Sequence, residues 1–262
     1  MLLELKVVDN NGNIKAVEKG DGSVNLAFPE EYREGDCIVI TVEEKNSHLL
    51  IQVDDALGAA FVYVTKNEIR YEVPFKEARL SLSPKAFSGN MHLISAREAM
   101  AEEIGNYRNL ALNVIDQHGD TGCYPHASAN VETRGEAVFA ARNAIDGVTE
   151  NHSHGIWPYT SWGINRREDA KFKLEFGRRV MIDRICLYTR ADFPHDSWWE
   201  MVTLTFSDGS EINWELEKSD KAQILELNGK QAEWLLLHKL KQADDPSPFP
   251  ALSQLEVYGR EE

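Results

Sequence analysis

Apolar and polar residues alternate with a period of two along much of the chain, a pattern that is typical of half-buried β-strands. The clearest case is Lys-Phe-Lys-Leu-Glu-Phe at 171–176, and residues 37–42 are rich in β-branched side chains. Residues 202–206 and 212–216 flank the turn Ser-Asp-Gly-Ser at 207–210. Glycine accepts the positive φ of a tight turn, so this segment predicts a β-hairpin.

Other turn signals divide the chain into short strands. Asn-Gly-Lys at 228–230 predicts a second hairpin, between strands at 224–227 and 232–240. Residues 58–64 and 69–73 are expected to form another pair of neighbouring strands. Turns recur every 8 to 15 residues or so without long helical patterns between them, which favours antiparallel β-sandwiches over alternating strands and helices.

One segment, residues 96–107, has the composition of a helix. Ser95 can cap its beginning and Gly105 can end it. The sequence therefore predicts an all-β protein made of two tandem, jelly-roll-like β-sandwich domains that are joined by a short helical linker. The expected parts are an N-terminal sandwich of unknown role at 1–95, the linker at 96–110 and a second sandwich at 111–262.

Charge and composition exclude some classes of partner. The net charge is −15, which gives the chain no electrostatic reason to bind nucleic acid or an anionic membrane. No apolar run approaches the roughly 18 residues of a membrane span, and the N-terminus lacks the pattern of a signal peptide. Three widely spaced cysteines fit no zinc or redox motif and are expected to be buried thiols. These features favour a cytoplasmic protein.

Residues 111–259 resemble the galactose-binding-like, or discoidin (F5/8 type C), family of carbohydrate-binding modules. The resemblance lies in four stretches that occur in the family's order, although residues 1–95 have no counterpart in it. The stretches are Ala-Ser-Ala-Asn at 127–130, Ala-Ile-Asp-Gly at 144–147, Phe-Lys-Leu-Glu-Phe-Gly at 172–177 followed by the strand at 182–188, and Ser-Gln-Leu-Glu-Val-Tyr-Gly at 253–259. The resemblance implies a β-sandwich with a sugar site in the loops at one end.

Two stretches, 152–162 and 189–199, contain the aromatic and polar side chains that sugar sites use. Aromatic rings stack on pyranose faces, and Arg, Asp and His hydrogen-bond hydroxyls. Family loops at these points form the site, so the two stretches are expected to meet. Arg190 and Asp192 are expected to bind hydroxyls, and one of the adjacent Trp198 and Trp199 is expected to be buried. The predicted ligand-binding residues are His152, His154, Trp157, Tyr159, Arg190, Asp192, His195, Trp198, Trp199 and Phe249.

The resemblance also implies a structural Ca²⁺ at the Ala-Ile-Asp-Gly turn, since such a turn offers several oxygen ligands. Carried over by position, the carboxylate would come from Asp146 and backbone carbonyls from Asn143, Val148 and Ser253. Asn151 and Gln254 would complete the set. Gln254 stands where the family has an acidic residue, and this loss of charge is expected to weaken the affinity. The implied metal ligands are Asn143, Asp146, Val148, Asn151, Ser253 and Gln254.

Three alternatives remain open beside non-catalytic carbohydrate binding. His152, His154, His195 and Asp196 could form a transition-metal site. A small enzyme acting on a sugar or uronate would use Arg190, Asp192 and His195, although no GxSxG, HExxH or P-loop motif is present. The exposed aromatic residues could instead form a subunit interface.

Overall fold

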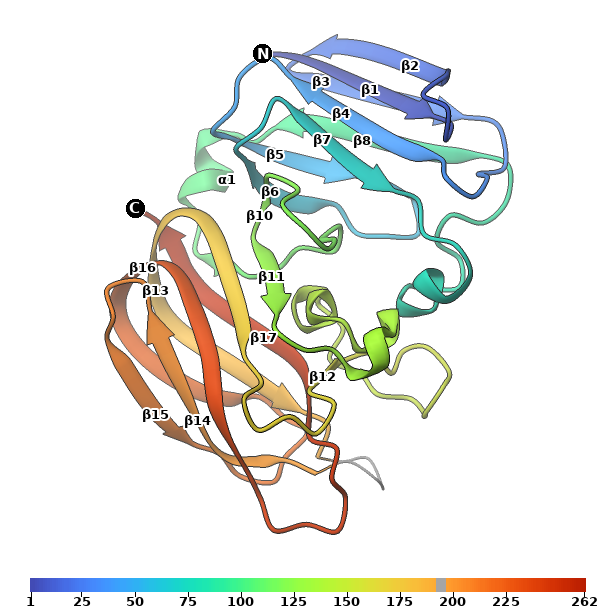
Figure 1. Ribbon diagram of the computed structural model, residues 1–262. Helices are drawn as coiled ribbons and strands as arrows, with labels where there is room; N and C mark the ends of the chain where they lie inside the picture. Colours follow the sequence, from blue (N-terminus) through green and yellow to red (C-terminus); the bar gives the residue numbers. More distant parts are fainter. Residues whose placement is uncertain (192–196) are drawn as a thin grey trace.

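A computed structural model describes residues 1–191 and 197–262 (Figure 1). The chain is built mainly from antiparallel strands, which confirms the all-β prediction. Strands β1 to β8 lie in one half of the molecule and strands β11 to β17 in the other (Figure 1). Within the described ranges, no helix is long and apolar enough to span a membrane.

The first half is a sandwich of two sheets. One sheet has the order β2-β1-β4-β7 and the other has the order β10-β6-β5-β8-β3. The short 3₁₀-helix η1 (Lys76–Ser81) lies between β7 and β8. The strands are β1 (Leu2–Val8), β2 (Ile14–Asp21), β3 (Ser23–Phe28), β4 (Cys37–Val42), β5 (Ser47–Gln52), β6 (Ala60–Val64), β7 (Glu68–Glu72), β8 (His92–Glu98) and β10 (Cys123–Tyr124).

Alternation along each strand explains why these two sheets pack together. In β3, Val24, Leu26 and Phe28 are buried while the residues between them are exposed, so one face of the strand enters the core. The predicted pairing of 58–64 with 69–73 is wrong, because β6 pairs with β5 and β7 pairs with β4. The link between β6 and β7 crosses from one sheet to the other, so both strands bury apolar residues in the same core.

The predicted helix at 96–107 is also corrected. Strand β8 continues to Glu98, and the only α-helix of the described residues is α1 (Ala101–Gly105). Ala96 is buried and opposes Val24 and Ile51 of the neighbouring strands, so sheet pairing overrides the helix propensity of this segment.

The domain boundary at 96–110 remains a prediction, but strand pairing crosses it. Strand β10, which lies beyond the boundary, pairs with β6 of the first sandwich. Cys123 of β10 and Ile115 belong to the hydrophobic core of the first half. Cys37, Cys123 and Cys186 are buried free thiols, as the sequence predicts.

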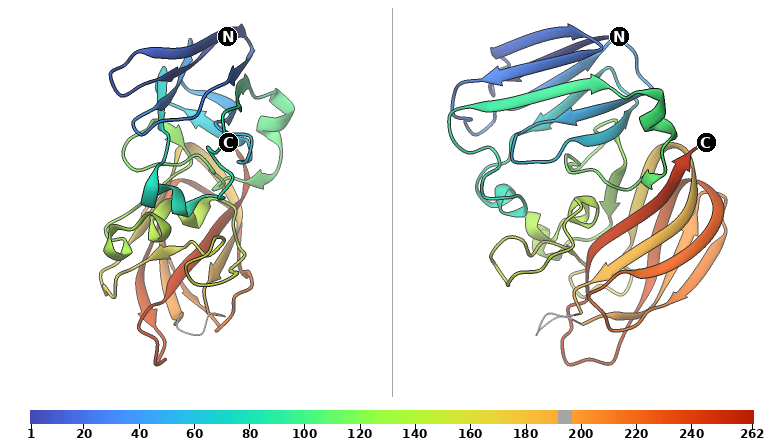
Figure 2. Two further views of the ribbon diagram at one scale, coloured as in Figure 1. Left: turned by 90° about the vertical axis from the view of Figure 1, so that its right-hand side faces the viewer. Right: turned by 180° about the vertical axis from the view of Figure 1, so that it is seen from behind.

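The second half contains one extended sheet with the order β12-β17-β13-β16-β14-β15, and its long strands are strongly curved (Figure 2). Strand β11 pairs with β13, and β9 pairs with β17. Three 3₁₀-helices precede the long strands: η2 (Thr133–Gly135), η3 (Ala137–Phe139) and η4 (Ala141–Ile145). The strands are β9 (Arg108–Asn109), β11 (His126–Ala129), β12 (Trp162–Gly163), β13 (Phe172–Thr189), β14 (Trp199–Phe206), β15 (Glu211–Glu215), β16 (Gln223–Gln242) and β17 (Ala251–Glu261).

One of the two predicted hairpins in this half is confirmed. Thr205 of β14 opposes Glu211 of β15 across the turn at 207–210. The hairpin predicted at 228–230 is wrong, because β16 runs through that segment as one strand. Asn228 and Gly229 adopt φ of 52° and 90°, and the register with β13 shifts beside them. The Asn-Gly pair therefore forms a bulge that bends β16, not a turn that ends it.

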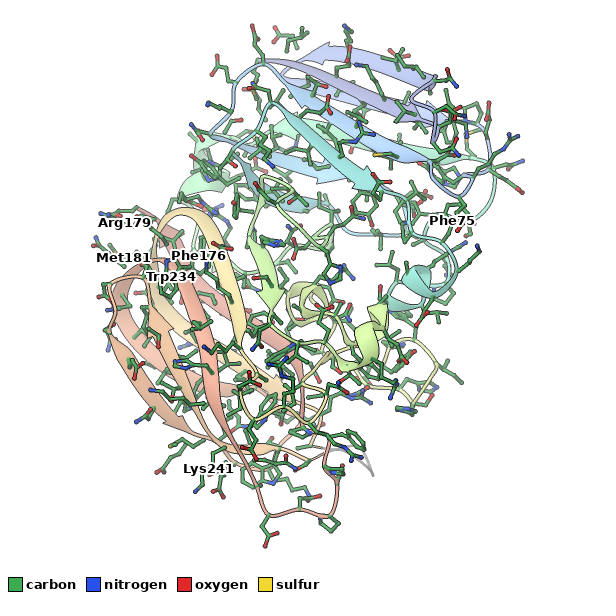
Figure 3. All side chains as sticks on the ribbon, viewed as in Figure 1. Phe75, Phe176, Arg179, Met181, Trp234 and Lys241 are labelled. Atoms are coloured by element: carbon green, nitrogen blue, oxygen red, sulfur yellow. The ribbon has the colours of Figure 1, made fainter. Side chains whose placement is uncertain are left out.

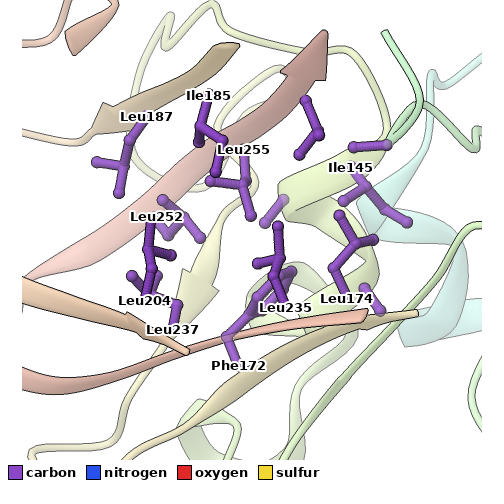
Figure 4. Close-up of a cluster of buried hydrophobic side chains, with 14 of the residues drawn as sticks. Ile145, Phe172, Leu174, Ile185, Leu187, Leu204, Leu235, Leu237, Leu252 and Leu255 are labelled. Carbon is purple, nitrogen blue, oxygen red and sulfur yellow. The ribbon is translucent and has the colours of Figure 1, made fainter. Parts of the chain in front are cut away.

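The core of the second half lies inside the curved sheet (Figure 4). Phe172, Leu174, Leu235, Leu237 and Leu255 are fully buried there, and each such side chain contributes roughly 1.5–3 kcal/mol by leaving water. In the view with side chains drawn as sticks, Met181 and Trp234 lie at the end of this sheet nearer the first half and Lys241 lies toward the other end (Figure 3).

A cluster of charged and aromatic side chains joins the two halves. Glu261 of β17 accepts hydrogen bonds from Arg108 and from Arg178, the latter at 2.8 Å from Nε and 2.5 Å from an Nη atom. His48 Nε2 of β5 lies 3.3 Å from the same carboxylate. The two guanidinium groups also stand over the rings of Phe61 and Tyr63 on β6, at 4.2 and 5.2 Å. Glu261 thus ties the second half to strands β5 and β6 of the first.

We predict that Glu261→Gln lowers the free energy of unfolding by about 2 kcal/mol at neutral pH, because it leaves two half-buried guanidinium groups without a counter-charge. Burial alone would raise the pKa of Glu261, but Arg178 and His48 hold it well below its ordinary value of 4.5. A lowered pKa stabilises the fold above pH 4.5 and less as the pH falls toward the folded-state pKa. Urea denaturation at several pH values should therefore show the deficit of the variant shrinking below pH 4.5.

The matched control is Glu262→Gln, which changes the neighbouring and more exposed carboxylate. We expect this variant to unfold with nearly the parental free energy. Equal losses from both substitutions would show that Glu261 has no special part in joining the halves.

Candidate functional site

A cavity of about 220 Å³ opens in the second half, where the 3₁₀-helices η2 and η3 meet the loops after β12 and before β17. Its wall combines guanidinium groups, aromatic rings and backbone. The lining residues are Thr133, Arg134, Phe139, His154, Gly163, Ile164, Asn165, Arg166, Arg190, Phe249, Pro250 and Ala251. We call this the loop pocket.

Tight local packing builds the wall of the loop pocket. Thr133 Oγ1 accepts a hydrogen bond from the Asn165 backbone N–H at 3.0 Å. A Cβ atom added to Gly163 would lie only 2.5 Å from the same oxygen, so the close approach of β12 to η2 requires glycine. Arg134, Asn165 and Arg166 all have left-handed backbones, with φ of 54°, 49° and 60°. Such strained conformations of residues other than glycine concentrate at functional sites.

Arg190 lies directly after the last residue of β13 and is only 1% exposed. Its backbone N–H donates to the Ala251 carbonyl at 3.2 Å, which continues the pairing of β13 with β17. One Nη atom donates to Ser161 Oγ at 3.5 Å. A rigid strand end therefore positions this guanidinium at the buried side of the loop pocket.

Aromatic rings flank the opening. Phe249 remains 41% exposed, and the Arg166 guanidinium stands 4.3 Å from the centre of its ring. Arg134 stands 5.5 Å from the ring of Phe139, and its charge is paired with Glu136 by two hydrogen bonds. The wall of the loop pocket thus contains both an exposed aromatic ring and a buried guanidinium. None of its described lining residues is acidic.

The structure brings three of the predicted ligand-binding residues together in the loop pocket: His154, Arg190 and Phe249. The ring of Tyr159 packs edge-on against His154 at 6.2 Å, and this tyrosine is only 7% exposed. His154 is itself exposed. Tyr159 therefore supports His154 and does not itself line the loop pocket.

Other predicted residues lie elsewhere. Trp199 is fully buried in the core, 6.3 Å from the ring of Trp162, and is corrected from a stacking residue to a core residue. Trp198 is half-buried and His152 is exposed, and neither lines the loop pocket. Trp157 lines a different cavity, of about 200 Å³, between the first half and the Asp146 turn.

Asp192, His195 and Asp196 lie outside the described residues. The part of the prediction that depends on them stays a prediction, which includes the transition-metal set and the enzyme alternative. Sequence reasoning missed Thr133, Arg134, Phe139, Asn165 and Arg166. The sequence indicates these residues only weakly, because arginines scattered over a loop look like those of an ordinary solvated surface.

Val148 and Gln254, two of the predicted calcium ligands, lie against the Asp146 turn. Gln254 Oε1 accepts the Gly147 N–H at 3.3 Å, which brings the closing strand β17 against the turn. Asp146 is 8% exposed, and its Oδ1 accepts the Val148 N–H at 2.8 Å. Asn151 Oδ1 and Gln254 Nε2 are buried and have no hydrogen-bond partner among the described residues.

Burial raises the pKa of Asp146 from 3.8 to about 7, although Arg142 and the Val148 N–H act in the opposite direction. A buried carboxylate that is costly to ionise in isolation would be stabilised by a bound cation. Asn143 fits less well by its side chain, whose oxygen already accepts from Arg142 at 3.2 Å. Its expected contribution was the backbone carbonyl.

No family model and no curated protein matches the chain. Among solved structures, the chain is similar to chitosan-binding module 1 of a chitosanase/glucanase from Paenibacillus sp. IK-5, with 20% identity, a TM-score of 0.41 and coverage of 58% of this chain and 98% of that one. It is similar to the family 32 carbohydrate-binding module of Clostridium perfringens NanJ in complex with galactose, with 18% identity, a TM-score of 0.40 and coverage of 50% and 91%.

A third similar structure is a mutant of the lectin-binding domain of Lectinolysin complexed with Lewis b, with 17% identity, a TM-score of 0.42 and coverage of 60% and 99%. At these levels of identity the likeness concerns the fold. The matched structures are a chitosan-binding module, a family 32 carbohydrate-binding module and a lectin-binding domain.

Proposed function

We propose that this protein binds carbohydrate without catalysis, and that the sugar occupies the loop pocket of the second half. The observation that carries the proposal is the exposed ring of Phe249 on the same cavity wall as the buried Arg190. A ring can stack on the apolar face of a pyranose, while a guanidinium can donate two parallel hydrogen bonds to neighbouring hydroxyls.

The size and rigidity of the loop pocket also support a small ligand. Drug-sized ligands occupy cavities of roughly 300–1,000 Å³, and the volume of about 220 Å³ here suits a single sugar ring at the end of a glycan. Arg190 is held by β13 and β17, and Asn165 by Thr133. Since these groups are ordered before binding, little entropy is lost when the sugar arrives.

A binding function requires no acid and base pair, and the described lining of the loop pocket has no carboxylate to act as one. The alternative of an enzyme acting on a sugar or uronate needs Asp192 and His195. Incubation with a bound oligosaccharide, followed by chromatography, separates the two functions: we expect the oligosaccharide to be recovered intact.

We further propose that the Asp146 turn holds a structural Ca²⁺. Asp146 would supply the carboxylate, and Asn151 and Gln254 would supply neutral side-chain oxygens, with Asn143, Val148 and Ser253 contributing carbonyls. A bound cation would offset the cost of the buried charge on Asp146 and fix the turn against β17. The single carboxylate in this set predicts weaker binding than in modules with an acidic residue at position 254.

Phe249→Ala is expected to weaken glycan binding at least tenfold and to leave the melting temperature nearly unchanged, because the ring is exposed and supplies stacking area. A glycan array identifies a ligand, and calorimetry with that ligand measures the change. The matched control is Tyr107→Ala, which removes another exposed ring far from the loop pocket lining and should leave the affinity intact. An array without any bound glycan would reject the proposed function.

Arg166→Ala is expected to weaken binding of the same glycan by a smaller factor, about two- to fivefold, because Arg166 orients Phe249 at the pocket opening. Combined with Phe249→Ala it should add little, since both substitutions remove one shared contact. Calorimetry on the two single variants and the double variant measures this coupling. Fully additive losses would show that Arg166 and Phe249 act separately.

Asp146→Asn tests the buried carboxylate. With calcium chelated, this variant should be more stable than the parent at pH 8, by up to about 4 kcal/mol, because ionisation of a group with a raised pKa opposes folding. The advantage should grow as the pH rises from 3.8 to about 7 and disappear below that range. Thermal denaturation with and without calcium completes the test: Ca²⁺ should raise the melting temperature of the parent and not of the variant.

A further inference from the structure

A group of potential metal ligands lies in the first half, remote in sequence from the loop pocket and the Asp146 turn. Asp54, Asp55 and His92 each offer one ligand atom, and these atoms lie within 4.8 Å of one another. Asp54 and Asp55 follow the end of β5, and His92 begins β8 opposite Phe28 at the end of β3. Because β8 runs antiparallel to both β3 and β5, its beginning meets the ends of those two strands.

His92 is positioned as a metal ligand would be. Its Nε2 lies 3.1 Å from the Gly89 carbonyl oxygen. A carbonyl can only accept a hydrogen bond, so Nε2 carries a proton, and Nδ1 carries the lone pair whenever the ring is neutral. Histidines that bind metals commonly donate their other N–H to a backbone carbonyl in this way, which fixes both the tautomer and the ring orientation.

The Nδ1 atom of His92 has no hydrogen-bond partner among the described residues, although the side chain is fully buried. It faces Asp54 Oδ2 at 3.4 Å. Two groups with lone pairs would repel each other at this separation, so a cation between them or a proton on Nδ1 is required.

The distance between His92 Nδ1 and Asp54 Oδ2 suits two ligands of a tetrahedral metal ion. Ligands at about 2.0–2.1 Å from a zinc ion at the centre of a tetrahedron stand roughly 3.3 Å apart, close to the 3.4 Å between His92 Nδ1 and Asp54 Oδ2. Backbone N–H groups of Ala56 and Phe87 hold the Asp54 carboxylate at 2.9 and 3.0 Å. The exposed Asp55 closes the set from the solvent side.

We propose that Asp54, Asp55 and His92 bind one borderline transition-metal cation of the Zn²⁺ class, with at least one coordination position left for water. A nitrogen ligand with two carboxylates favours such a cation over Ca²⁺, which prefers oxygen ligands alone. The ion links the turn after β5 to the beginning of β8. The ring of Tyr32 packs on His92, with 4.4 Å between the ring centres.

The test is calorimetric titration of Zn²⁺ into the metal-free full-length protein, with a thermal melt at each ratio. The parent protein should bind one Zn²⁺ at micromolar or tighter affinity and melt at a higher temperature when loaded. Asp55→Asn changes an exposed side chain and should fold normally, and we expect it to weaken Zn²⁺ binding at least tenfold. His92→Gln should abolish binding at this site.

Two controls separate this site from other ligands of the chain. The double variant His152→Ala/His154→Ala removes the exposed histidines of the loop, and Asp146→Asn removes the carboxylate of the turn. Both should keep the Zn²⁺ affinity of the parent. Absence of Zn²⁺ binding, or binding that survives Asp55→Asn and His92→Gln, would overturn the proposal and leave Asp54 and His92 as a buried ion pair.

Discussion

Pairing of β13 with β16 on one side and β17 on the other is the constraint on which the second half depends. A central strand has its backbone hydrogen bonds satisfied on both edges, so its ends are fixed in space. One end delivers Arg190 to the loop pocket, where the backbone pairing continues to Ala251. The interior of the same strand, where the register shifts between Glu175 and Val180, carries Arg178 toward the first half. A single strand thus sets both the geometry of the candidate site and the joint between the halves.

Much of the fold follows from local pattern. Strict alternation at 171–176 and the Gly-containing turn at 207–210 need only neighbouring residues to be understood. Residues 96–98 and 228–230 were misassigned because their conformation is decided by distant partners: Ala96 is buried between β3 and β5, and Asn228 bulges out of a strand that β13 holds in register. Local propensity is outweighed wherever sheet pairing buries the segment.

Some residues of the candidate site could likewise be predicted from the sequence, and others could not. His154, Arg190 and Phe249 could be predicted because their residue types and their place beside recognisable strands suggest a sugar site. The roles of Arg134, Asn165 and Arg166 arise from left-handed backbones and contacts across three segments, which no spacing reveals. Trp198 and Trp199 illustrate the limit: neighbours at a strand end point to opposite faces, and only the register with β16 decides that Trp199 enters the core.

Strand β10 pairs with β6, and Cys123 adds to the core of the first half, so the chain returns to the first sandwich before it completes the second. An engineer who transplants the second sandwich onto another protein must keep residues 108–111, because β9 pairs with β17 and because Leu110 and Ala111 are buried in the second core. Such a fragment also carries β10 away from β6 as an orphaned edge strand, whose unpaired backbone groups invite association between copies. The two sandwiches look like separate modules, but β10 and Cys123 belong to the sheet and the core of the first one.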